Sequence, residues 1–241
     1  RHMTTLTLGT ATAGQNRPLI AVPVTGTTIS AVLGQVEQIN ESRADVIEWR
    51  VDYLTDLVNL RAADVQTILF NADKPVIFTW RTAAEGGQRP FDIALYELVY
   101  RLAIKTGVAA IDIEHQLFTQ VADLVADAHT AQVPIINSQH FFADTPINLD
   151  QVFGQALMTA ADVIKVATMP QTDADVDRLL ATTQQFATEG KPLITMAMGE
   201  LGQRTRTIGG RNGSQLTFAT LGAASAPGQL DLATLLTLLE D

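Results

Sequence analysis

The residues of this 241-residue chain that could do chemistry lie within or just after apolar runs. Lys165 stands inside "ADVIKVATMP" (161–170), a run typical of a buried strand. In a strand covered on both faces an ammonium cannot easily reach water, and desolvation lowers the pKa of a lysine. A neutral amine is a nucleophile toward ketones. From this run alone, a structural lysine and a Schiff-base lysine are equally good explanations.

Histidine can transfer protons near neutral pH, so the histidines come next. His140 stands at the tip of the preceding apolar run, "VPIINSQHF" (133–141), and is the better candidate for a general acid and base. His115, one residue beyond Glu114, is a second candidate. His129 falls in a helical pattern and is expected to face solvent. Taken alone, a histidine is more often structural than catalytic.

Carboxylates and guanidinium groups follow other runs. Glu48, Arg50 and Asp52 alternate along "VIEWRVD", and a strand would point all three to one face. Such groups, if buried, either pair with each other or bind something polar. Asp112 and Glu114 share a face in the same way along "AIDIEH".

Four further stretches are polar or rich in sulfur. Arg81 ends "FTWR" with Glu85 in the loop after it, and Met196 and Met198 share a face of "ITMAMG". The glycine-rich stretch that follows, "ELGQRTRTIGGRNGS", is expected to be a polar loop and carries three arginines, Arg204, Arg206 and Arg211. Glycine-rich segments there can bind phosphate in barrels, which is a weak indication. The segment "GAASAPGQLDL" adds Ser225 and Gln229, as a lid or merely a loop.

The elements that must position these residues follow a βα repeat. Eight runs predict strands, at 18–26, 45–53, 74–82, 107–115, 133–141, 162–170, 191–199 and 214–222, and helical patterns between them include 28–42, 92–107 and 173–190. Eight strands apolar on both faces favour a closed (β/α)8 barrel over an open doubly wound sheet. Residues 4–15 predict a short β-hairpin that caps the barrel floor. We expect residues 1–3 to be a cloning remnant and 4–241 to form one catalytic domain.

Composition narrows the classes of partner. A formal net charge of −10 disfavours nucleic acid and anionic membranes, and no apolar run is long enough to cross a bilayer. The absence of cysteine excludes thiolate chemistry and is compatible with a reducing cytoplasm. We therefore expect a soluble protein that binds neither nucleic acid nor a membrane.

In a barrel the catalytic groups gather at the carboxyl ends of the strands. Six residues would project near that mouth: Glu48, Arg50, Arg81, His140, Lys165 and Arg206. One shared site explains them better than six unrelated structural roles. An amine, an imidazole and several arginines suit a small anionic carbonyl compound.

The motifs "EWRVD", "FTWRTAAEGG", "NSQHFFADTP", "IKVATMP", "TMAMG", "RTRTIGGRNGSQLTF" and "SAPGQ" together resemble those of the type I 3-dehydroquinate dehydratases, over almost the whole chain. The resemblance implies a (β/α)8 barrel, commonly dimeric, that uses no metal or organic cofactor. It implies that Lys165 forms an imine with 3-dehydroquinate, that His140 is the acid and base of a syn elimination, and that Glu85 orients or tunes His140. It further implies a substrate-binding set of Glu48, Arg50, Arg81, Arg206, Ser225 and Gln229, and apolar pocket positions Phe142, Met196 and Met198.

Some positions depart from the family pattern. Phe141 stands where the family usually has Asp or Asn, Arg211 and Asn212 replace less polar residues, and Pro23 replaces a serine of some members. A class I aldolase, which can use the same lysine position, is the alternative enzyme, and a phosphate cradle would favour it. A barrel that only binds a sugar acid or a partner protein is the non-enzymatic alternative, and a buried amine beside a base argues against it.

Overall fold

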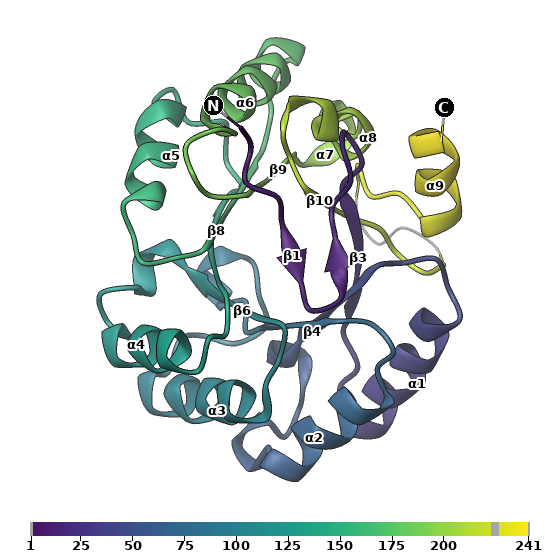
Figure 1. Cartoon of the computed structure of the whole chain (residues 1–241), viewed down its shortest axis with the longest axis vertical. Helices are drawn as coiled ribbons and strands as arrows, with labels where there is room; N and C mark the ends of the chain where they lie inside the picture. The colour runs from purple at the N-terminus through teal and green to yellow at the C-terminus, as the bar shows by residue number, and fades with distance from the viewer. Residues whose placement is uncertain (1, 223–226, 241) are drawn as a thin grey trace.

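The computed structural model describes residues 2–222 and 227–240, and it forms a ring of parallel strands surrounded by helices (Figure 1). The strands of the ring are β3 (Leu19–Val24), β4 (Val46–Arg50), β5 (Val76–Thr79), β6 (Ala110–Glu114), β7 (Ile135–Phe141), β8 (Val163–Thr168), β9 (Leu193–Ala197) and β10 (Leu216–Phe218). Each pairs in parallel with the next along the chain up to β9, and β10 pairs with β3. The expected barrel is confirmed.

The ring closes between β9 and β10 through a short contact instead of a full ladder. Leu193 and Ser214 form a parallel bridge, and the N–H of Gln215 donates to the carbonyl of Leu193 at 2.8 Å. Because Gln215 also accepts from the N–H of Leu19 at 2.9 Å through its carbonyl, this one residue joins both sides of the seam.

The helices of the described part are α1 (Ile29–Asn40), α2 (Ala62–Asn71), α3 (Ile93–Thr106), α4 (Ala122–Thr130), α5 (Leu149–Leu157), α6 (Asp173–Phe186), α7 (Gly199–Gly202), α8 (Thr205–Ile208) and α9 (Leu232–Glu240). Capping residues determine where several of these helices begin and end. The side chains of Thr28 and Asp92 cap α1 and α3 by accepting from the N–H groups of Ala31 and Leu95. Gly107 ends α3 with a φ of 90°, a conformation that suits glycine.

Two apolar layers hold the barrel together. The outer layer lies between strands and helices, and there Trp49 meets Phe78 edge on with ring centroids 5.6 Å apart. Phe78 in turn meets Tyr100 of α3 at 5.1 Å. The hydroxyl of Tyr100 donates to the carbonyl of Asp112 at 2.6 Å and accepts from the N–H of Trp80 at 2.8 Å. One helix side chain thereby fixes β5 and β6 at the level of the polar interior.

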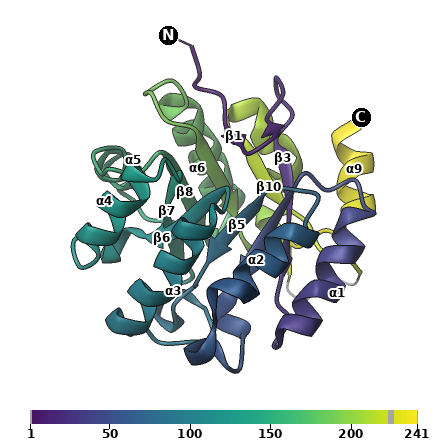
Figure 2. The same cartoon turned by 60° about the horizontal axis from the view of Figure 1, so that its bottom comes forward.

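The predicted N-terminal hairpin is confirmed as the antiparallel pair β1 (Thr7–Leu8) and β2 (Ala11–Thr12). It lies over one end of the barrel (Figure 2). Leu6 and Leu8 are buried there against the inner apolar layer, which includes Val46 and Ile136. The other end is left for the polar residues.

The segment after β9 differs from the predicted loop, because it folds into α7, α8 and the 3-10 helix η5 (Gly209–Asn212). Glycine is what permits this packing. A Cβ on Gly202 would lie 2.2 Å from the carbonyl oxygen of Ala197, so α7 can rest on β9 only without a side chain there. The glycines of this segment therefore serve helix packing that places Arg206.

Candidate active site

A pocket of about 520 Å³ opens at the carboxyl ends of the strands. The strand side chains that point into the barrel are apolar toward the hairpin, as Val46 and Ile136 are, and polar toward the pocket, as Glu48 and Lys165 are. The pocket is lined by eleven of the twelve residues proposed for the site: Glu48, Arg50, Arg81, Glu85, His140, Phe142, Lys165, Met196, Met198, Arg206 and Gln229. The twelfth, Ser225, lies outside the described residues.

Lys165 projects from the middle of β8 into this pocket and is only 5% exposed. Its Nζ lies 3.9 Å from Glu48 Oε2 and 4.0 Å from Asp112 Oδ2, and 4.5 Å from the centre of the Phe218 ring. Burial lowers the pKa of Lys165; Glu48 and Asp112 oppose that shift, and Arg81 adds to it. The amine is thus closer to its reactive neutral form than an exposed lysine.

His140 ends β7 beside Lys165, and Glu85 holds it. Glu85 Oε1 accepts from the backbone N–H of His140 at 2.8 Å and lies 3.3 Å from its Nδ1. Burial, followed by the positive charges of Arg81 and Lys165, lowers the pKa of His140 well below its usual range. The imidazole is therefore neutral at pH 7 and can accept a proton.

Glu85 has an equally altered environment. Burial, together with the negative charge of Glu114, raises its pKa from 4.5 to about 8. Arg81 and the N–H of His140 oppose this rise. Since Glu85 and His140 share a contact, the two groups take up and release protons as a pair.

Arg81 forms the centre of a buried ionic network below the pocket. Its Nη2 donates to Asp112 Oδ2 at 2.9 Å, and its Nη1 donates at 2.9 Å to both Glu114 Oε2 and Ser138 Oγ. Burial alone would raise the pKa of Asp112, but Arg81 and Lys165 bring it below the ordinary value. The network fixes Arg81 and keeps carboxylates near Lys165.

Arg50 is also paired, with Asp52 in a two-point contact at 2.8 and 2.9 Å. Asp52 lies beyond the end of β4, in the 3-10 helix η1 (Val51–Tyr53), and also accepts from the N–H of Arg81 at 3.1 Å. The internal salt bridge considered from the sequence therefore exists, but it joins Arg50 to Asp52 while Glu48 faces Lys165.

Arg206 differs from the other arginines of the pocket. It is 8% exposed, and burial lowers its pKa. Its Nε is buried without a hydrogen-bond acceptor, and no ion pair joins it to a carboxylate of the described residues. A buried cation without an anion is expected to bind one. Arg204, in contrast, pairs with Asp177 at 2.7 Å on the surface.

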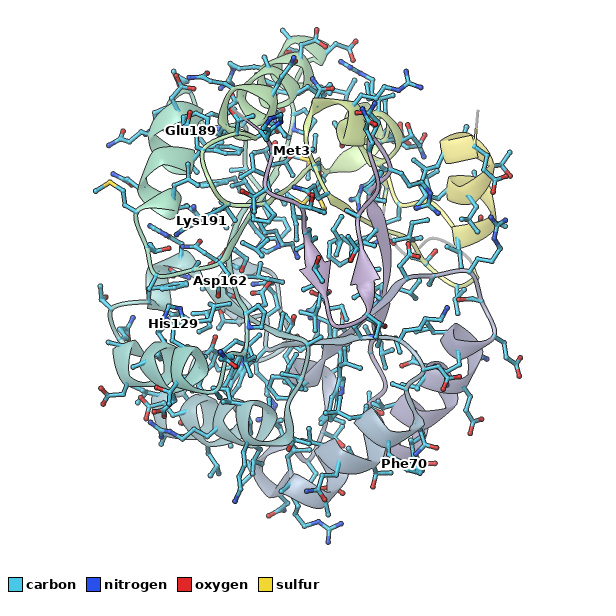
Figure 3. The ribbon with its side chains drawn as sticks, viewed as in Figure 1. Met3, Phe70, His129, Asp162, Glu189 and Lys191 are labelled. Carbon is cyan, nitrogen blue, oxygen red and sulfur yellow. The ribbon has the colours of Figure 1, made fainter. Side chains whose placement is uncertain are left out.

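The remaining histidines are outside this pocket. His115 Nδ1 accepts from the side-chain Nδ2 of Asn137 at 2.9 Å, on the outer side of the barrel. His129, Asp162 and Lys191 lie at the hairpin end (Figure 3), where His129 and Asp162 line a cavity of about 480 Å³. His129 Nε2 is 2.7 Å from the carbonyl of Ala160, so its contact is structural.

The roles of several residues in the pocket and in the network below it were missed from the sequence. Asp112 and Glu114 were seen to share a face but were given no partner, and the partner is Arg81. Phe218, under the Lys165 amine, and Gly86, against Phe142, had no polar signal to reveal them. Strand alternation after Gln215 could have placed Phe218 inside the barrel.

No metal ligand cluster and no helix able to span a membrane occur in residues 2–222 and 227–240. The chemistry available to the described pocket residues is that of a buried amine, a neutral imidazole paired with a carboxylic acid, and a free guanidinium. These features define the class: a (β/α)8 barrel with the constellation expected of a Schiff-base enzyme for an anionic ketone.

Comparisons with known proteins give the family. Residues 20–241 match the model of type I 3-dehydroquinase. The chain is 41% identical over 236 residues to the 3-dehydroquinate dehydratase of Lactiplantibacillus plantarum, covering 95% of this chain and 94% of that one. It is 39% identical over 243 residues to that of Klebsiella pneumoniae strain 342, covering 95% of both. The chain therefore belongs to the type I 3-dehydroquinase family.

Solved structures agree with this assignment. The 3-dehydroquinate dehydratase of Geobacillus kaustophilus superposes with a TM-score of 0.90 at 32% identity, covering 98% of this chain and 95% of the other. The type I enzyme of Clostridium difficile, solved with covalently modified comenic acid, gives 0.89 at 31% identity, covering 99% and 97%. The predicted family and fold are confirmed.

Proposed function

We propose that this chain is a 3-dehydroquinate dehydratase that converts 3-dehydroquinate to 3-dehydroshikimate and water in the shikimate pathway. The observation that carries the proposal is the juxtaposition of buried Lys165 with the His140 and Glu85 pair in one pocket. Family membership supports the same reaction.

The proposed reaction starts when neutral Lys165 attacks the C3 ketone and water leaves, giving a protonated imine. The imine withdraws electrons from C2, and His140 takes the C2 proton. The electrons of that C–H bond form an enamine, which expels the C1 hydroxyl on the same face as His140 returns a proton, so that water departs. Hydrolysis of the imine then releases the product and restores the amine.

The other residues have positioning roles in this proposal. Glu85 holds His140 and, in its ionised form, stabilises the imidazolium that forms after proton transfer. Arg206, with Gln229 and Ser225, binds the substrate carboxylate, and the unpaired buried guanidinium of Arg206 supports this. Glu48, Arg50 and Arg81 bind ring hydroxyls through donors and acceptors left by their own pairs. Phe142, Met196 and Met198 form the apolar wall.

Turnover with purified protein tests the function. Addition of 3-dehydroquinate should give the ultraviolet absorbance of a conjugated product, and Lys165→Met should lose it while keeping the parent circular dichroism spectrum. Retro-aldol cleavage of a phosphorylated ketose, with no dehydration, would favour the class I aldolase instead. Binding without turnover of either substrate would favour the non-enzymatic barrel.

Four more proposals go with this function. Residues 4–241 form a single catalytic domain, the chain forms a homodimer, it works in the cytoplasm, and it uses no metal or organic cofactor. Light scattering on the eluted protein tests the dimer, and cell fractionation tests the location. The assignment of residues 1–3 to a cloning remnant stays a prediction.

A further inference from the structure

Glu85 lines both the active-site pocket and a second cavity of about 280 Å³, here called the rear cavity. The rear cavity is lined by residues that follow β6 and end β7, including His115, Gln116, Gln139 and Phe141. His140 lines both cavities as well. Glu85 and His140 are therefore accessible from both cavities.

Gln116 contacts Glu85 from the rear cavity. Its Nε2 donates to Glu85 Oε2 at 3.1 Å, whereas Glu85 Oε1 receives the backbone N–H of His140 at 2.8 Å. Each Glu85 carboxyl oxygen is thus held by a different element, because Oε2 accepts from the 3-10 helix η4 (His115–Leu117) and Oε1 accepts from β7. Leu117 anchors η4 in the core with 4% exposure.

We propose that Gln116 is a positioning residue for the dehydration, acting from outside the substrate pocket by holding the Glu85 carboxyl group in place at His140 and favouring its ionised form. The inference rests on the proposed function. An amide N–H donated to a carboxylate stabilises the ionised form, and a fixed second oxygen limits rotation of the group toward His140. Gln116 touches no substrate in this arrangement.

The groups that face Glu85 make such a donor useful. Glu114 and Asp112, on β6, repel the carboxylate, and burial adds to their effect. Arg81, after β5, attracts it but is shared with both of those acids. Burial lowers the pKa of His115, which lies on the same 3-10 helix as Gln116. Among these neighbours, Gln116 and the N–H of His140 are the donors in direct contact with Glu85.

The test compares the pH dependence of kcat/KM for 3-dehydroquinate in paired variants. Gln116→Leu removes the donor and should make Glu85 harder to ionise. The acidic limb of the kcat/KM profile, which reports that ionisation, should move up by about half a pH unit. Gln116→Lys replaces it with a cation and should move the limb down. Gln120→Leu and Gln120→Lys are matched controls at an exposed glutamine nearby, and their limbs should stay at the parent position.

Opposite shifts for the two Gln116 variants support the proposal, since loss of packing would shift both in one direction. Limbs that coincide with the Gln120 controls overturn it. A second readout needs no turnover: the imidazole titration of His140, followed by nuclear magnetic resonance, should move to lower pH in Gln116→Leu, because a Glu85 that ionises less readily stabilises the imidazolium less. If the parent dehydrates nothing but the titration still shifts, the proposed function fails while the Gln116 contact stands. Unmoved titrations reject the contact.

Discussion

At the scale of residues, burial determines which protonation states the site offers. Lys165 and His140 are both moved toward their neutral forms by burial, and the nearby arginines assist. Glu85 is moved the same way, to a pKa of about 8. The site thus holds a nucleophile, a base and a neutralised acid within one pocket, and each can be tested by a single substitution.

His140→Ala should lower turnover by about 10²- to 10⁴-fold, the usual contribution of a positioned acid and base. The imine should still form, because Lys165 remains buried and the pocket remains open. Mass spectrometry after borohydride reduction measures the imine, and a steady-state assay measures turnover. Turnover equal to that of the parent would remove His140 from its proposed role.

Glu85→Gln should change how stability depends on pH. The folded protein binds a proton at Glu85 that the unfolded chain releases between pH 4.5 and about 8. Stability from this proton is fully present below pH 4.5 and is lost as pH rises to about 8. The parent should therefore lose up to about 1.4 kcal/mol of unfolding free energy per pH unit relative to Glu85→Gln across this window.

Urea denaturation of both proteins at several pH values measures this difference. A constant offset between parent and Glu85→Gln at all pH values would show that Glu85 is not protonated preferentially in the folded state. Because Glu85 and His140 titrate as a pair, the slope reports the proton uptake of that pair, whereas hydrogen bonds lost by the substitution contribute a constant offset.

At the scale of elements, the alternation of side chains along each strand predicts most of the residues that face the site. The strand positions of Glu48, Lys165 and Met196 followed from apolar runs alone, because a two-residue period fixes the face of each side chain. Contacts between side chains of different elements could not be predicted from the sequence in this way. The pairing of Arg50 with Asp52 needs the 3-10 turn after β4, and Gln116 meets Glu85 only because two separate loops converge.

The segment after β9 shows why local composition was insufficient. Its glycines and polar residues predicted a loop, yet close packing on β9 gives α7 and α8. Gly202 belonged to the predicted loop, whereas the fold uses its missing side chain to bring two backbones together. Such a contact depends on how the chain packs back on β9, which local composition does not reveal.

Gly202→Ala should therefore displace α7 from β9, destabilise the protein and raise KM by moving Arg206. Gly154→Ala is the matched control: it lies in α5 with no atom within 4 Å of the added carbon, and should stabilise by about 0.5 to 1 kcal/mol. Thermal denaturation and steady-state kinetics measure both effects. Equal melting temperatures for the two variants would contradict the packing argument.

At the scale of the whole molecule, the residues that close and stabilise one end of the barrel lie apart from the reactive residues at the other end. The hairpin closes one end with Leu6 and Leu8, while the reactive groups line the other. The formal charge of −10 is unfavourable for an anionic substrate, so the local cations of the pocket must supply the attraction. Arg206 is the cation best placed for this role, because its guanidinium has no ion pair among the described residues.

Leu8→Ala tests this separation. Leu8 is 0% exposed, and its truncation should lower the unfolding free energy by about 2 to 5 kcal/mol. Because Leu8 lies at the end opposite the pocket, kcat well below the melting temperature should remain that of the parent. A variant with full stability, or one with lost turnover while still folded, would contradict the division between the two ends.

The central claim is that Lys165 forms an imine with 3-dehydroquinate, and trapping measures it most directly. Parent protein is mixed with 3-dehydroquinate, reduced with borohydride, digested and mapped by mass spectrometry. The account predicts one covalent adduct, on the peptide that carries Lys165, and none in Lys165→Met. Turnover by a folded parent protein with no adduct on Lys165 would contradict it.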